Sequence, residues 1–130
     1  MNRTILLTGI LLGLLAIVFG AFGAHGLEKL VDAEAVETFE VGVRYQMYHA
    51  LFLLFLGIWS GVEAGIKKAV YWMVLVGVIL FSFSIYLLAM NSLMAFDFKT
   101  FGFLTPIGGV FMILGWVFLG YHILTKKRAI

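Results

Sequence analysis

The sequence predicts an all-α integral membrane bundle of four transmembrane helices, with an amphipathic outer helix between the first and the second. Of the 130 residues, 63% are hydrophobic and 12% are charged, whereas a soluble domain is about 45–50% apolar and about 25% charged. The mean hydropathy is +1.09. Four apolar stretches are each close to the roughly 20 residues that a helix needs to cross a bilayer. Residues 1–130 therefore form one membrane domain whose surplus apolar surface faces lipid.

The four spans are predicted from the apolar runs, which cover residues 4–24, 45–62, 69–90 and 104–124. Each run is apolar on all sides, whereas a strand of a membrane barrel alternates between apolar and polar residues. We expect the last span to begin at Thr105 and Pro106, because threonine is a common helix N-cap and proline a common first helical residue.

Residues 27–44, between the first two spans, are too long and too regularly patterned for a plain loop. Apolar side chains recur at helical spacing on one side, and charged side chains occupy the other. The two sides are formed by Val36, Phe39 and Val43, and by Glu34, Glu37, Glu40 and Arg44. This pattern predicts an amphipathic helix on the outer surface, capped by Asp32 and free of proline, so that it is able to run unbroken into the second span. This helix is expected either to pack over the bundle or to bind a partner.

The distribution of lysine and arginine predicts the orientation, since positive residues in short loops stay on the cytoplasmic side. The termini and the connection between the second and third spans carry six such residues: Arg3, Lys67, Lys68, Lys126, Lys127 and Arg128. The other side carries three, Lys29, Arg44 and Lys99. Trp59 and Trp72 fall at the predicted inner boundary, as interfacial tryptophans do. We therefore expect a multi-pass protein of the cell inner membrane with both termini in the cytoplasm.

Small residues predict where the helices pack closely. The first span carries a heptad-like stripe of them and the second span a shorter one. The stripes consist of Gly9, Gly13, Ala16, Gly20 and Gly23, and of Gly57 and Gly61. Their contact lies either within one chain or between copies in a homo-oligomer.

A few polar residues interrupt the apolar runs, and all are expected in the outer half of the bundle. They are His25, Tyr45, Gln46, His49, Ser82, Ser84 and Thr105. Polar groups in lipid are costly unless they are paired, so this cluster is either a set of interhelical hydrogen bonds or a ligand site. We expect His25, Gln46 and His49 to approach one another. A metal or haem between the two histidines is the weakest interpretation, and no metal site is predicted.

The composition also limits the classes of function. The chain has no cysteine, which excludes thiolate chemistry, and its net charge of +2 is too small and dispersed for a nucleic-acid partner. No catalytic residues and no cofactor are predicted, so a non-enzymatic role is expected. The expected partners are the lipid bilayer, a lipid or other hydrophobic small molecule, and a membrane-protein partner or second copy. An oligomeric channel or transporter-like protein is the alternative.

Four motifs, in order, resemble a family of small four-helix inner-membrane proteins of unknown function typified by bacterial YgdD and YwdK. They are Gly20-Ala-Phe-Gly-Ala-His25, Tyr45-Gln-Met-Tyr-His49, Leu80-Phe-Ser-Phe-Ser84-Ile-Tyr86, and Thr105-Pro-Ile-Gly-Gly109 with Gly115-Trp116. The resemblance covers essentially the whole chain and implies an integral membrane domain without established catalytic residues. Phe83 departs from the family, which usually has a glycine between the two serines.

Overall fold

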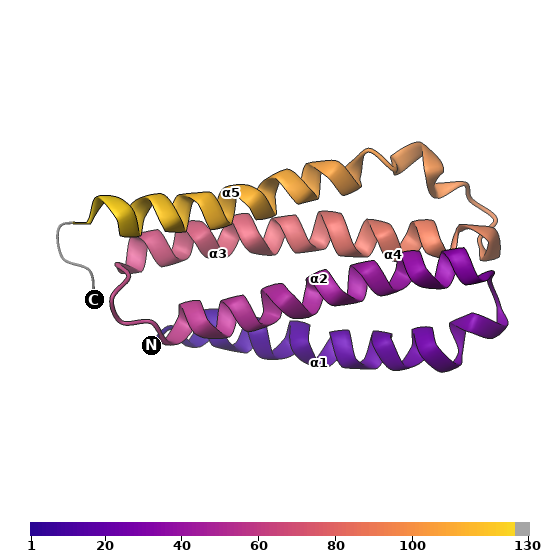
Figure 1. Cartoon of the computed structure of the whole chain (residues 1–130), viewed down its shortest axis with the longest axis horizontal. Helices are drawn as coiled ribbons and strands as arrows, with labels where there is room; N and C mark the ends of the chain where they lie inside the picture. Colours follow the sequence, from indigo (N-terminus) through magenta and orange to yellow (C-terminus); the bar gives the residue numbers. More distant parts are fainter. Residues whose placement is uncertain (127–130) are drawn as a thin grey trace.

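The computed structural model describes residues 1–126 and confirms the all-α class: four long helical segments run antiparallel along a common axis (Figure 1). The segments are α1 (Arg3–His25), α2 (Ala33–Ile58), α3 (Ala64–Val78) continued through η2 (Ile79–Phe83) into α4 (Ser84–Ala89), and α5 (Leu104–Thr125). Three short 3-10 turns are η1 (Leu27–Lys29), η3 (Asn91–Leu93) and η4 (Phe98–Phe101). All four long segments are apolar and long enough to cross a membrane.

The segments form layers in the order α1, α2, α3 with α4, and α5 (Figure 1). α1 packs mainly on α2, and α5 packs on α3 and η2, so a larger share of the two middle segments is buried. Both Asn2 and Lys126 lie at one end, where Asn2 bonds Gly57 in the last turn of α2 and Lys126 bonds Gly61 in the turn after α2. We call this the terminal end, and the opposite end, which carries the connections 26–32 and 90–103, the distal end.

α1 begins where the sequence predicts, because the side chain of Asn2 caps it by accepting a hydrogen bond from the backbone N–H of Ile5 at 3.0 Å. Its small residues face α2. A Cβ atom on Gly9 would lie 2.9 Å from the carbonyl oxygen of Ala50, so that backbone contact requires glycine. Gly13 is looser, with its nearest neighbour at 3.7 Å.

The predicted amphipathic segment is helical and runs unbroken into the second span, which confirms the prediction. Asp32 caps a helix that continues without a break to Ile58, so residues 33–44 form the first three turns of α2 and pack beside α1. Phe39 on this segment is only 2% exposed. The segment is held in the bundle by its apolar side, while its charged side stays exposed.

α2 ends four residues before the predicted end of the second span, at Ile58. The backbone of Trp59 is extended and closes the helix. Gly61 therefore lies in the turn between α2 and α3 rather than in a packed helix, and its carbonyl oxygen accepts a hydrogen bond from Lys126. Gly57, the other small residue of this span, does pack closely, since a Cβ there would lie 2.9 Å from Leu6.

The third helical segment starts at Ala64, five residues before the prediction. The prediction used the uncharged run and so left Lys67 out of the span. This lysine nevertheless lies in the first turn of α3, is 5% exposed and donates a hydrogen bond to the carbonyl oxygen of Gly57 at 3.3 Å. The segment contains a π-helical turn at η2. Gly108 of α5 packs against this turn so closely that a Cβ would collide with the backbone nitrogen of Phe81.

α5 begins at Leu104, as predicted, but Thr105 is not its N-cap. Phe103 occupies that position without a side-chain cap, and the Thr105 hydroxyl bonds Ser84 instead. Pro106 thus lies two residues further into the first turn than expected, where its missing N–H still costs no intrahelical bond.

Candidate functional site

The most buried part of the predicted polar cluster joins three helices. Gln46 of α2 is fully buried, and its side-chain Nε2 donates to the carbonyl oxygen of Leu12 in α1 at 2.8 Å. Its Oε1 accepts from the hydroxyl of Tyr86 in α4 at 2.6 Å. Both ends of the amide are therefore used to connect α1, α2 and α4.

The two predicted serines and Thr105 lie around the π-helical turn. Ser82 donates to the carbonyl oxygen of Gly42 in α2 at 2.8 Å. Ser84 donates to the carbonyl oxygen of Phe81 at 2.9 Å, and its hydroxyl lies 2.6 Å from that of Thr105. Because the single hydroxyl hydrogen of Ser84 is donated to Phe81, Thr105 is the donor in the bond between the two hydroxyl groups. These bonds connect η2 to α2 and α4 to α5.

His49 forms a separate bridge between α2 and α5. Its Nε2 accepts from the indole N–H of Trp116 at 3.0 Å, so Nδ1 carries the proton and donates to the carbonyl oxygen of Tyr45 at 2.8 Å. Both ring nitrogens are thus occupied, and the tautomer follows from the network. The ring of Tyr45 itself is 40% exposed and packs on Phe81 with the ring centres 5.3 Å apart.

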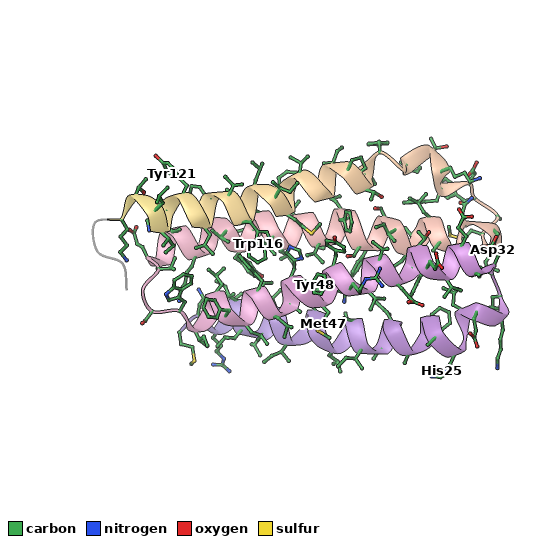
Figure 2. All side chains as sticks on the ribbon, viewed as in Figure 1. His25, Asp32, Met47, Tyr48, Trp116 and Tyr121 are labelled. Atoms are coloured by element: carbon green, nitrogen blue, oxygen red, sulfur yellow. The ribbon has the colours of Figure 1, made fainter. Side chains whose placement is uncertain are left out.

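His25 lies outside this network, contrary to the prediction that it approaches His49. It is exposed at the last residue of α1. Figure 2 shows His25 near the distal end of the bundle, whereas Trp116, the hydrogen-bond partner of His49, lies near the middle. A paired histidine site is therefore not formed.

The reason lies in the register of α1 and α2. Because Gln46 bonds Leu12, His49 is level with the first half of α1, roughly 20 Å or more along the axis from His25 at about 1.5 Å per residue. The prediction started the second span at Tyr45 and so placed His49 near the distal boundary. α2 starts three turns earlier, which moves His49 away from the start of the helix and to the middle of the bundle.

The buried side chains of the cluster use their polar atoms in hydrogen bonds within the bundle. Every buried side-chain nitrogen and oxygen atom in residues 1–126 has a partner. Two of the partners, Tyr86 and Trp116, stand inside the motifs of the sequence but were not predicted as cluster members, because aromatic residues in apolar runs are usually packing residues. The observed arrangement supports the interhelical-bond interpretation for the buried members of the cluster, Gln46, His49, Ser82 and Ser84.

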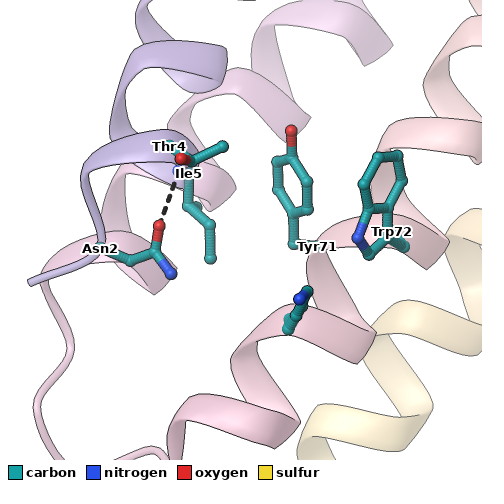
Figure 3. A pocket seen from close by; sticks show the side chains of 6 residues that line it. Asn2, Thr4, Ile5, Tyr71 and Trp72 are labelled. Atoms are coloured by element: carbon teal, nitrogen blue, oxygen red, sulfur yellow. Dashed lines mark hydrogen bonds between the residues drawn. The ribbon is translucent and has the colours of Figure 1, made fainter.

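A different polar site lies at the terminal end, between α1 and α3 (Figure 3). It is a pocket of about 360 Å³ lined by Asn2, Thr4, Ile5, Lys68, Tyr71 and Trp72. The Asn2 side-chain oxygen is engaged by Ile5, which leaves the amide N–H groups as donors. Sequence reasoning missed this site because it used Lys68 for orientation alone and Trp72 as an interfacial anchor.

The inner wall of this pocket is fixed by a pair of hydroxyl groups. Thr8 donates to the carbonyl oxygen of Thr4 at 2.9 Å, so Tyr71 donates its hydroxyl hydrogen to Thr8, also at 2.9 Å. Tyr71 is 7% exposed and packs edge-on against Trp72, which is half exposed. The pocket therefore has a rigid aromatic wall and an open side.

Comparison with known proteins places the chain in a family. The sequence model described as "Protein of unknown function (DUF423)" matches residues 19–109. A UPF0382 membrane protein of Staphylococcus saprophyticus is 39% identical over 117 residues, which cover 90% of this chain and 93% of the relative. The UPF0382 membrane protein YwdK of Bacillus subtilis is 34% identical over 119 residues, covering 90% and 93%.

No solved structure matches the chain. The relatives agree with the membrane bundle described above, and their similarity extends over nearly the whole chain. The chain therefore belongs to the DUF423 family of proteins of unknown function, and it is an integral membrane protein.

Proposed function

We propose that the protein binds an anionic phospholipid, with the headgroup in the pocket between α1 and α3. The observation that carries the proposal is that one pocket combines the ammonium group of Lys68, the free amide N–H groups of Asn2, and the aromatic walls Tyr71 and Trp72. Basic pockets between transmembrane helices are typical sites for acidic lipid headgroups. The role is non-enzymatic.

The depth of the pocket supports a headgroup. Asn2 and Ile5 belong to the cap and first turn of α1, and Lys68 lies about one turn inside α3. These positions coincide with the membrane boundary when the apolar length of α1 spans the hydrocarbon. Trp72 lies one turn deeper than Lys68 on the same face, where an indole ring commonly meets the glycerol region and upper acyl chains.

The charge at the terminal end favours an anion. In residues 1–126, Arg3, Lys67, Lys68 and Lys126 stand there against the single carboxylate of Glu63. The predicted orientation, with both termini in the cytoplasm, turns this end toward the inner leaflet. Acidic lipids give that surface a negative potential, which attracts each nearby lysine by about 1 kcal/mol.

Lipid competition in native mass spectrometry tests the proposal. The purified protein is exchanged into mixed micelles that contain phosphatidylglycerol and phosphatidylcholine with the same acyl chains. We expect a preference for phosphatidylglycerol that Lys68→Gln lowers about fivefold, the equivalent of about 1 kcal/mol. Inorganic phosphate in excess should not displace the lipid, because the acyl chains contribute to binding.

Lys126→Gln is the matched control, since it removes the same charge from the same end but outside the pocket. It should leave the preference within about twofold of the original. Equal losses in both variants would mean that only the general surface charge attracts lipid, and displacement by phosphate would assign the pocket to a soluble anion.

A further inference from the structure

α2 carries a stripe of side chains that no other helix within residues 1–126 covers, charged toward the distal end and apolar toward the terminal end. The stripe consists of Glu37, Glu40, Arg44, Tyr48, Leu51, Phe55 and Ile58, all of them exposed. Their separations of three or four residues give a heptad-like pattern along one side of the helix. Tyr48, Leu51, Phe55 and Ile58 are 53–60% exposed. The side is thus available over the whole length of the membrane.

The position of α2 against α1 fixes the depth of the charges. Gly23, two residues from the end of α1, contacts Phe39, and Gly20 contacts Val43. The 23 residues of α1 measure roughly 34 Å, close to the hydrocarbon thickness of about 30 Å. Glu40 therefore lies near the distal boundary, and Arg44 lies about one turn inside the hydrocarbon.

A guanidinium group one turn inside lipid needs a partner, because water is scarce there and an isolated charge is costly. Arg44 can lean toward the distal end, since helical side chains point toward the N-terminus of their helix. That direction brings its guanidinium level with Glu40. A charged pair of opposite signs on an exposed helix face is self-complementary.

We propose that this stripe is the contact surface for a second copy of the chain, related by a two-fold axis along the membrane normal. In such an isologous contact, equivalent residues lie at the same depth. Arg44 of each copy then meets Glu40 of the other copy as well as its own, and four charges neutralise one another. Leu51, Phe55 and Ile58 continue the contact as an apolar seam toward the terminal end.

The lack of cysteine makes crosslinking a direct test. We expect Leu51→Cys to form a disulfide-linked dimer on mild oxidation in native membranes. Ile113→Cys on α5 and Ile10→Cys on α1 are matched controls, because both side chains are exposed to lipid to a similar extent, 62% and 55% against 56%. Crosslinking at Leu51 no stronger than at the two controls would overturn the proposal.

Exchange of charges tests the pairing itself. Glu40→Arg and Arg44→Glu, each expressed alone, place like charges in the seam and should reduce the dimer fraction about tenfold. Expressed together, the two variants should recover a one-to-one heterodimer, read by native mass spectrometry with differently sized tags. Dimers that persist in both single variants would contradict the contact. So would a mixture that forms no heterodimer although each variant keeps the original melting temperature.

Discussion

At the scale of single residues, the polar side chains of the bundle act as fasteners between helices. Gln46 illustrates this, because one amide group holds Leu12 of α1 and Tyr86 of α4 at the same time. In lipid there is no hydrophobic drive between helices, so packing and such bonds determine which faces meet. The specificity of the bundle therefore depends on a small number of polar atoms.

Tyr86→Phe tests the strength of this connection. The substitution removes the hydroxyl donor and leaves the Gln46 oxygen without its partner. Bonds of this kind in membrane proteins contribute about 0.6 kcal/mol on average and up to about 1.7. We expect a loss in this range in the free energy of unfolding, measured by denaturant titration in detergent. Tyr121→Phe, at a side chain that is 62% exposed, should have no effect; an equal loss there would remove the argument.

Asp97 gives a prediction for pH. Its carboxylate accepts hydrogen bonds from the backbone N–H of Lys99 at 3.0 Å and from Asn91 at 3.1 Å, and these bonds, the first above all, hold its pKa below the ordinary range. Because the pKa of Asp97 is lower in the folded chain, its ionised carboxylate stabilises the folded loop. This stabilisation is fully present at a pH above the ordinary carboxyl pKa, and it is lost as the pH falls through the lowered pKa of the folded chain. Carboxyl 13C titration should show the low midpoint, and Asn91→Ala should raise it. An unchanged midpoint in that variant would exclude the side-chain contribution.

At the scale of elements, the closest backbone approach between helices involves glycines that the sequence analysis did not predict as packing residues. Gly77, Gly108 and Gly115 let α5 touch the backbone of α3 and η2. The predicted stripe on α1 was an easier pattern, because its small residues recur regularly. The contact at η2 also depends on a π-helical turn, and no residue pattern in 79–83 reveals one.

Gly108→Ala should therefore weaken the bundle. The added Cβ would meet the carbonyl oxygen of Gly77 at 2.7 Å as well as the backbone of Phe81, and backbone atoms have no alternative rotamer. We expect a loss of about 1–3 kcal/mol in stability, measured as above. Gly120→Ala is the control, because nothing lies within 4 Å of its Cβ position and alanine is the better helix former. A loss of the same size at Gly120 would point to helix propensity or lipid contact instead of packing.

The sequence predicted the presence and type of the elements better than their ends. Long apolar runs are an unambiguous sign of lipid-facing helices, so all four were found. The uncharged runs end short of the helices where a charged residue is helical, as with Lys67 and with the residues before Tyr45, although the latter were predicted as an amphipathic helix. An uncharged run measures the part of a helix that lies in lipid, while the helix itself continues past that part.

At the scale of the whole molecule, the candidate site was the least predictable part. Which residues meet in the polar cluster depends on their positions along the bundle axis, and these positions depend on where each helix begins and ends. The error at the start of α2 brought His25 and His49 together in the prediction. By contrast, Ser82, Ser84 and Thr105 do lie in the distal half, Gln46 lies near the middle of α2, and all four bond between elements. A single-sequence pattern fixes the face of a helix but not its sliding position against a neighbour.

Topology is the prediction at this scale. The excess of positive residues at the terminal end predicts that this end is cytoplasmic. In a cysteine-free chain, Glu34→Cys at the distal end should react with an impermeant maleimide in intact cells, whereas Lys126→Cys should react only after lysis. The reverse pattern would place the phospholipid pocket in the other leaflet.

The layered order of the helices also bears on how the chain enters the membrane. α1 makes most of its contacts with α2, and α3 makes most of its contacts with α5. The turn between α2 and α3 is short. The chain is thus two helical hairpins in series, each assembled from neighbours in sequence, which then dock through α2 and α4. Separate expression of residues 1–60 and 61–130 in one cell should therefore yield two inserted fragments that co-purify, and fragments that insert but never associate would show that the short connection is needed for docking.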